Sequence, residues 1–122
     1  MPEKTSLSEI LNQYQEALLT QFPDQVQRLV LFGSQARQEP SPESDIDVLV
    51  IVSWEEEQLA EGHYAAPFND PRWRMIVELA YDLTLEYGVT LSPLVMSEKR
   101  FKQWSPLNNR IKQDGIDIWK KN

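Results

Sequence analysis

Two stretches of the chain decide its fold: Leu29-Val-Leu-Phe-Gly-Ser-Gln-Ala-Arg37 and Ser44-Asp-Ile-Asp-Val-Leu-Val-Ile-Val52. Each contains a run of β-branched and large apolar residues, which predicts a strand, and Gly33 ends the first run. Asp45 and Asp47 open the second run. Because side chains alternate along a strand, the two carboxylates are expected on one face, about 6 to 7 Å apart along the chain. The sequence therefore predicts two strands joined by a turn, with paired acids at the start of the second strand.

The turn and the paired acids together suit a metal-bound nucleotide. Gly33 lets the backbone approach a phosphate closely, and Ser34 and the residues after it can present N–H groups and a hydroxyl to that phosphate. Two carboxylates at this spacing suit shared ligation of Mg²⁺, which prefers carboxylate, water and phosphate oxygens. The structural alternative makes Ser34 a turn residue and the aspartates the entry of a strand. That alternative leaves two carboxylates at the head of an apolar strand unexplained.

Composition and charge narrow the function classes. With 122 residues, 41% apolar and 25% charged, the chain has the composition of a globular protein and room for one domain, residues 1–122. Cysteine is absent, no signal peptide stands out and no apolar run approaches the roughly 20 residues of a membrane span, so we expect a cytoplasmic protein without membrane contact. The net charge of −7 argues against a strong nucleic-acid footprint. A loose basic group is interpreted as a solvated helical face: Lys99, Arg100, Lys102, Arg110 and Lys112.

Apolar periodicity and capping residues predict the remaining elements. Ser6 with Glu9 forms a capping-box pattern, Asp70 followed by proline provides a helix start, and Gly88 suits the residue after a helix end. Pro93 marks its strand as bulged or at a sheet edge. We expect helices over residues 6–21, 34–38, 70–87, 98–104 and 106–114, and a short helix or helical turn over 54–60. Strands are expected over 26–32, 45–52 and 89–96, a turn over 39–44 and a loop over 61–69.

This arrangement resembles the nucleotidyltransferases of the polymerase-beta superfamily, in which a Gly-Ser turn precedes an Asp-x-Asp pair between two strands, as Gly33-Ser34 and Asp45-x-Asp47 do here. It looks most like the minimal branch, the MNT proteins, and the likeness extends to the helix ending Tyr87-Gly88 and the tail Asn108-x-x-Ile-x-x-Asp-Gly115. The resemblance implies a single nucleotidyltransferase domain of the α+β class, with a small mixed β-sheet packed against helices in two layers. Because MNT proteins are often antitoxins of helical HEPN-family toxins, it also implies a HEPN partner, with a hetero-oligomer as one expected assembly.

The resemblance implies roles for individual residues. The family transfers a nucleoside monophosphate from ATP or another NTP to a hydroxyl and releases pyrophosphate, with Mg²⁺ as cofactor. Metal binding is expected at Asp45 and Asp47, nucleotide binding at Gly33, Ser34 and Arg37, and catalysis at Asp45, Asp47 and Ser34. Arg37 lies about one helical turn after Ser34, so its guanidinium can reach phosphate oxygens. The equally weighted alternative is that Arg37 pairs with a nearby acid and braces the loop.

The third carboxylate that the superfamily usually supplies from a later strand is not evident. In the matching stretch Val89-Thr-Leu-Ser-Pro-Leu-Val-Met96, the positions expected to align with that acid hold Thr90 and Ser92, and neither can act as a carboxylate base. Three consequences stay open: one metal suffices, Asp82 or Glu86 substitutes, or the chain binds nucleotide without turnover. Asp82 and Glu86 are otherwise interpreted as a solvated helix face.

Three functions therefore compete. The first is an antitoxin that transfers AMP or another NMP to a hydroxyl of a HEPN-type partner, favoured because the chain is too short to carry a separate acceptor-binding subdomain. The second is a non-catalytic antitoxin or binding module that masks its partner by contact. The third is modification of a small molecule, such as an aminoglycoside, by a homo-oligomer. The preferred NTP, the acceptor, the number of metals and any general base stay open.

Overall fold

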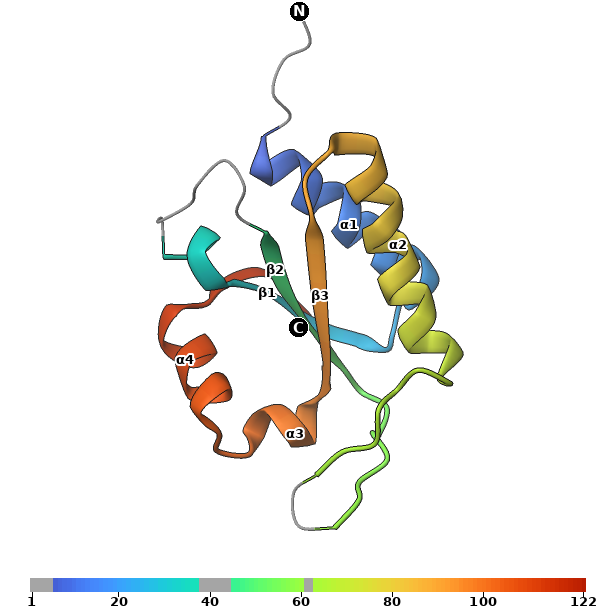
Figure 1. Ribbon diagram of the computed structural model, residues 1–122, viewed down its shortest axis with the longest axis vertical. Coiled ribbons are helices and arrows are strands. Elements are labelled where there is room, and N and C mark those ends of the chain that lie inside the picture. The colour runs from blue at the N-terminus through green and yellow to red at the C-terminus, as the bar shows by residue number, and fades with distance from the viewer. Residues whose placement is uncertain (1–5, 38–44, 61–62) are drawn as a thin grey trace, which may run out of the picture.

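The computed structural model describes residues 6–37, 45–60 and 63–122, so the turn expected over 39–44 lies outside the described residues. Helices and strands alternate irregularly along the chain (Figure 1). In chain order they are α1 (Leu7–Gln21), β1 (Val26–Phe32), the 3₁₀ turn η1 (Gly33–Gln35), β2 (Ile46–Val52), α2 (Pro71–Tyr87), β3 (Leu91–Ser97), α3 (Glu98–Lys102), α4 (Pro106–Asp114) and β4 (Ile116–Lys120).

The strands form one mixed sheet in the order β3-β2-β1-β4 (Figure 1). β1 runs antiparallel to β2 and to β4, whereas β2 and β3 are parallel. A parallel pair needs a crossover connection, and α2 lies in the one between β2 and β3. The α+β class and the small mixed sheet packed against helices are thus confirmed. β3 lies at an edge of the sheet and keeps a continuous register with β2, so Pro93 marks an edge strand and not a bulge.

Helices cover both faces of the sheet (Figure 1). The side chains of β2 alternate between two hydrophobic clusters, since this strand is buried on both faces. Val48 packs in the larger cluster with residues of α1 and α2, and Leu49 packs in the smaller cluster with residues of α3 and α4. Asp45 and Asp47 share the side of Leu49, because every second residue of a strand points the same way. The two acids therefore belong to the α3–α4 face.

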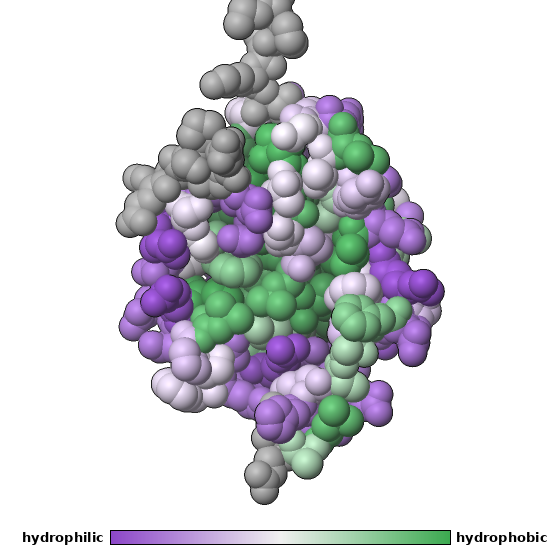
Figure 2. Space-filling view, in the orientation of Figure 1, coloured by the Kyte–Doolittle hydropathy of each residue, from purple (hydrophilic) through white to green (hydrophobic). Residues whose placement is uncertain are grey.

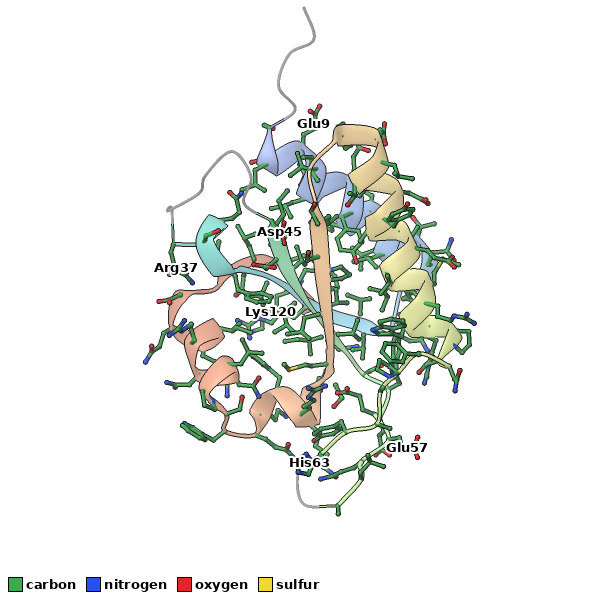
Figure 3. The ribbon with its side chains drawn as sticks, viewed as in Figure 1. Glu9, Arg37, Asp45, Glu57, His63 and Lys120 are labelled. Carbon is green, nitrogen blue, oxygen red and sulfur yellow. The ribbon has the colours of Figure 1, made fainter. Side chains whose placement is uncertain are left out.

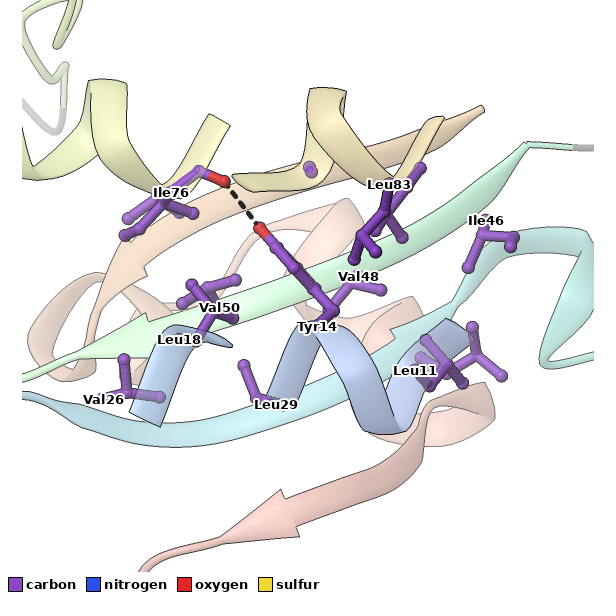
Figure 4. Close-up of a cluster of buried hydrophobic side chains, with 14 of the residues drawn as sticks. Leu11, Tyr14, Leu18, Val26, Leu29, Ile46, Val48, Val50, Ile76 and Leu83 are labelled. Carbon is purple, nitrogen blue, oxygen red and sulfur yellow. Dashed lines mark hydrogen bonds between the residues drawn. The ribbon is translucent and has the colours of Figure 1, made fainter. Parts of the chain in front are cut away.

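Tyr14 of α1 lies in the middle of the larger cluster (Figure 4). The residue is 1% exposed, and its hydroxyl donates a hydrogen bond of 2.9 Å to the carbonyl oxygen of Ile76 in α2. Burial raises the pKa of the Tyr14 phenol above its usual range, so the hydroxyl remains a donor. This hydrogen bond joins the two helices that cover one face of the sheet.

Replacing Tyr14 with Phe is expected to lower the free energy of unfolding by about 1 to 2 kcal/mol, because the ring remains and only the buried hydrogen bond is lost. Urea unfolding measures the difference. Tyr81→Phe is the matched control, since Tyr81 is 59% exposed and should change little. Equal stability losses in the two variants would contradict a specific role for the Tyr14–Ile76 bond.

The predicted helix ends are confirmed by side-chain caps. The Ser6 hydroxyl accepts a hydrogen bond of 3.2 Å from the Glu9 N–H, and the Asp70 carboxylate accepts one of 2.9 Å from the Arg72 N–H. Gly88 ends α2 in the left-handed conformation at φ 70°. These local signals were sufficient because each cap joins residues that are four or fewer positions apart.

The prediction of a short helix or helical turn over residues 54–60 is wrong. Gln58 instead forms an isolated antiparallel bridge with Tyr64. The Glu56 carboxylate accepts hydrogen bonds of 2.7 Å from the Ser97 N–H and 2.9 Å from the Arg100 guanidinium. Contacts with residues about forty positions away thus outweigh the local helix preference of this acidic segment.

Two further elements differ from expectation. The short helix expected after Ser34 is the 3₁₀ turn η1, and β4 was not predicted. β4 pairs with β1 and forms the second edge of the sheet. Across the described part of the chain, no helix has the length and apolar character that crossing a membrane would require.

Candidate functional site

Asp47 is the second residue of the inner strand β2, near one end of the sheet. It pairs with Phe32 on β1 and with Ser92 on β3. Asp45 is exposed just before β2, and Figure 3 shows it at the start of that strand, with Arg37 at the η1 side of the same end of the molecule. The sheet register thus sets the acid pair between η1 on one side and β3 on the other.

Gly33 brings the turn against the Asp47 carboxylate. Its φ is +75°, in the left-handed region that favours glycine. A Cβ built at Gly33 would lie 3.2 Å from Cγ of Asp47 and closer still to its Oδ2 atom. Glycine is therefore needed here both for the backbone conformation and for space. The predicted Gly-Ser turn therefore lies directly against Asp47.

The environment of Asp47 disfavours its negative charge. Burial is the main cause of a raised pKa for Asp47, and the neighbouring Asp45 carboxylate raises it further. The positive charge of Arg37 acts in the opposite direction. Arg37 therefore lies close enough to Asp47 to influence it electrostatically, whatever other contact it makes.

The donor set at this site fits a hard divalent cation that brings its own oxygen ligands. Asp45 and Asp47 supply two carboxylates, and their mutual repulsion would be relieved by a cation. Within residues 6–37, 45–60 and 63–122, no group of three or more His, Cys, Asp or Glu side chains is arranged to hold a metal. Mg²⁺ commonly binds through one or two carboxylates, with water and substrate phosphates completing its shell.

Among the described residues, no third acid joins Asp45 and Asp47 in a group that could hold a metal. Ser92 pairs with Asp47, and the carbonyl oxygen of Thr90 accepts a hydrogen bond of 2.8 Å from the Ile46 N–H, so both residues lie beside the start of β2. Asp82 and Glu86 are exposed on α2, which covers the opposite face of the sheet. Substitution by either acid has no support among the described residues.

Sequence reasoning missed the contribution of α4 to this site. A cavity of about 170 Å³ separates η1 from α4, and charged side chains at its wall include Arg37, Arg110 and Asp114. Arg110 belongs to the basic group that was interpreted as a solvated face. Arg110 stands next to Ile111, a buried residue, and this was the one available signal in the sequence. Because Arg110 and Arg37 are 73 positions apart in the sequence, no local pattern indicates that they line the same cavity.

An open groove of about 700 Å³ runs along residues 93–96 of β3, and neither Asp45 nor Asp47 lines it. Leu94 lies two residues beyond Ser92 on the same side of β3, and Trp104 and Leu107 contribute the opposite wall. Trp104 is 77% exposed. Figure 2 shows hydrophobic side chains gathered on this face of the molecule. His63 lies at the far end from Asp45 (Figure 3).

Known proteins are similar to this chain in sequence and in fold. Residues 11–121 match the model of the nucleotidyltransferase domain family. A protein of Methanocaldococcus jannaschii, named as a candidate protein adenylyltransferase, is 28% identical over 119 residues, covering 95% of this chain and 98% of that protein. The mixed sheet, the Gly-Ser turn and the facing acid pair define a nucleotidyltransferase, and the chain belongs to the nucleotidyltransferase domain family.

Two solved structures share the fold. A toxin–antitoxin complex with AMP-PNP matches with a TM-score of 0.57 at 20% identity, over 91% of this chain and 73% of that one. A complex of a tri-AMPylated Shewanella oneidensis HEPN toxin with an MNT antitoxin matches with a TM-score of 0.51 at 18% identity, over 94% and 74%. At these identities the likeness establishes the fold alone.

Proposed function

We propose that this protein transfers AMP from ATP to a hydroxyl group of a HEPN-type partner protein, in the presence of Mg²⁺, as the antitoxin of a toxin–antitoxin pair. The observation that carries the proposal is the contact between the Gly33 turn and Asp47, with Asp45 on the same face. The relative named as a candidate protein adenylyltransferase supports AMP as the transferred group. The HEPN toxin and MNT antitoxin complex of the same fold supports the partner.

In this proposal the Gly33 turn, Asp45 and Asp47 bind the nucleotide that donates AMP. The Gly33 turn offers backbone N–H groups to the triphosphate, Ser34 adds its hydroxyl, and Arg37 adds a guanidinium. Mg²⁺ held by Asp45 and Asp47 would neutralise charge on the phosphate oxygens. The role of the protein is to position the reacting groups and to stabilise charge, which dominate phosphoryl-group transfers.

The transfer itself makes one bond and breaks one. The acceptor hydroxyl oxygen bonds to the α-phosphorus, the bond from that phosphorus to its bridging oxygen breaks, and pyrophosphate leaves with the bridging oxygen. The hydroxyl proton passes to solvent, because Ser92 offers no carboxylate opposite Asp47. Attacking and leaving oxygens lie roughly in line, so with the triphosphate on η1 the acceptor enters from the β3 side. The groove with Leu94 and Trp104 opens on that side.

Transfer of labelled AMP tests the proposal. Purified protein, Mg²⁺, ATP labelled at the α-phosphate and the product of the neighbouring gene, tested as the HEPN-type partner, should together yield labelled partner. Omitting Mg²⁺ or adding excess EDTA should abolish the label, and label at the γ-phosphate should not be transferred. Absence of transfer from ATP and from every other NTP would overturn the catalytic proposal.

A second function, masking of the partner by contact alone, is favoured by one observation. Ser92 stands beside Asp47 where a third carboxylate would complete the acid set. The double variant Asp45→Asn/Asp47→Asn separates the two functions in cells that express the partner. Neutralisation that survives this change would favour contact, whereas its loss would favour transfer.

A further inference from the structure

Arg110 has no role in the proposed donor site, although it lines a cavity that Gly33 and Arg37 of that site also line. The cavity of about 170 Å³ is lined by Phe32 of β1, Gly33 of η1, Arg37 just after η1, and Leu107, Arg110, Ile111 and Asp114 of α4. Ile111 is 2% exposed and packs in the smaller hydrophobic cluster, so α4 is fixed against the sheet. Arg110 directly precedes Ile111, and the packing of Ile111 places Arg110 at the wall of the cavity.

The charge at this cavity is unusual for the chain. The protein has a net charge of −7, yet two guanidiniums line a small space that also touches the Gly33 turn. Asp114 adds one carboxylate, which leaves a net charge of +1 on the lining side chains. Arg110 is exposed and forms no ion pair with any residue that the structure describes. Its fork of N–H donors is therefore open to an external anion.

Resting on the proposed function, we propose that Arg110 binds the β- and γ-phosphates of the nucleotide and holds the departing pyrophosphate, so that the site selects triphosphates over monophosphates. With the α-phosphate at Asp45 and Asp47, the rest of the triphosphate passes the Gly33 turn, and the cavity lies beside that turn. A planar guanidinium makes paired hydrogen bonds to phosphate oxygens, which favours Arg over Lys at this position.

Binding of ATP, ADP and AMP to the full chain with Mg²⁺, measured by calorimetry, tests the role of Arg110. Arg110→Gln should weaken ATP binding about 10-fold or more and leave AMP binding unchanged, because a lost charge-assisted hydrogen bond affects only the ligand that makes it. Arg110→Lys should restore part of the ATP affinity. The ratio of ATP to AMP affinity reports a phosphate contact, which a purely structural role would not alter.

Lys112→Gln is the matched control. It removes the same charge from α4, but Lys112 lines a different hollow and lies 5.1 Å from the centre of the Phe101 ring. ATP affinity should stay at the wild-type value in this control. Wild-type ATP binding by Arg110→Gln, or equal losses for ATP and AMP, would overturn the inference. If the wild-type chain itself binds no ATP with Mg²⁺, the proposed function fails first, and Arg110 loses its role with it.

Discussion

Replacing both Asp45 and Asp47 with Asn is expected to lower the transfer of AMP to the partner by about 1,000-fold or more. The two carboxylates are the paired acids that the structure sets beside the Gly33 turn, and the amides would no longer attract Mg²⁺. A loss of this size corresponds to about 4 kcal/mol of lost transition-state stabilisation. Transfer of α-labelled phosphate to the partner measures it, and the single variants show whether the two acids act as one unit.

The same variants should remain folded, which separates a catalytic effect from unfolding. Burial and the Asp45 charge raise the pKa of Asp47 in the folded protein, so its ionised form opposes folding at neutral pH. Asp47→Asn should therefore be as stable as the wild type at pH 7, or more stable. This difference should shrink as the pH falls through the folded-state pKa and should vanish below about pH 4, where the unfolded-state carboxyl is protonated as well.

Thermal unfolding at pH 7 and at pH 4 measures this pH dependence. A lower stability of Asp47→Asn at pH 7 would contradict the argument from burial and charge. Retention of wild-type transfer by the double variant would remove the acid pair from the mechanism. The two measurements therefore test the electrostatics and the chemistry of the same residues separately.

Gly33→Ala is expected to lower AMP transfer by about 100-fold, because its Cβ would displace the Asp47 carboxylate from the turn. It should also lower the free energy of unfolding by about 1 to 3 kcal/mol, since alanine at φ +75° is strained and the new methyl group has no room. Transfer is measured at a temperature at which the variant is folded, so that the two effects are separated.

Gly88 provides the matched control for backbone strain. Its φ is +70°, close to that of Gly33, but no atom lies within 4 Å of a Cβ built there. Gly88→Ala should therefore lower stability by about 1 kcal/mol and leave transfer unchanged. Equal activity in the two alanine variants would show that the contact between Gly33 and Asp47 has no catalytic consequence.

Local sequence signals predicted the elements that depend on near neighbours. The Ser6 and Asp70 caps, the end of α2 at Gly88 and the buried strand β2 all arise from residues a few positions apart. The segment 54–60 shows the limit of such signals. Its composition favours a helix, yet the Glu56 carboxylate is hydrogen-bonded to Ser97 and Arg100. These distant partners, and not the local composition, determine the conformation of the segment.

The amino-acid sequence by itself determined the chemical groups of the candidate site. Gly33, Asp45 and Asp47 can be recognised by their residue types and by their spacing within one turn and two strands. Only the tertiary structure decided what surrounds them. The register of β3 sets Ser92 beside Asp47, and the packing of α4 through Ile111 carries Arg110 to the cavity next to the turn. Such neighbours are fixed by the burial of distant apolar faces against one sheet, and no local pattern encodes that packing.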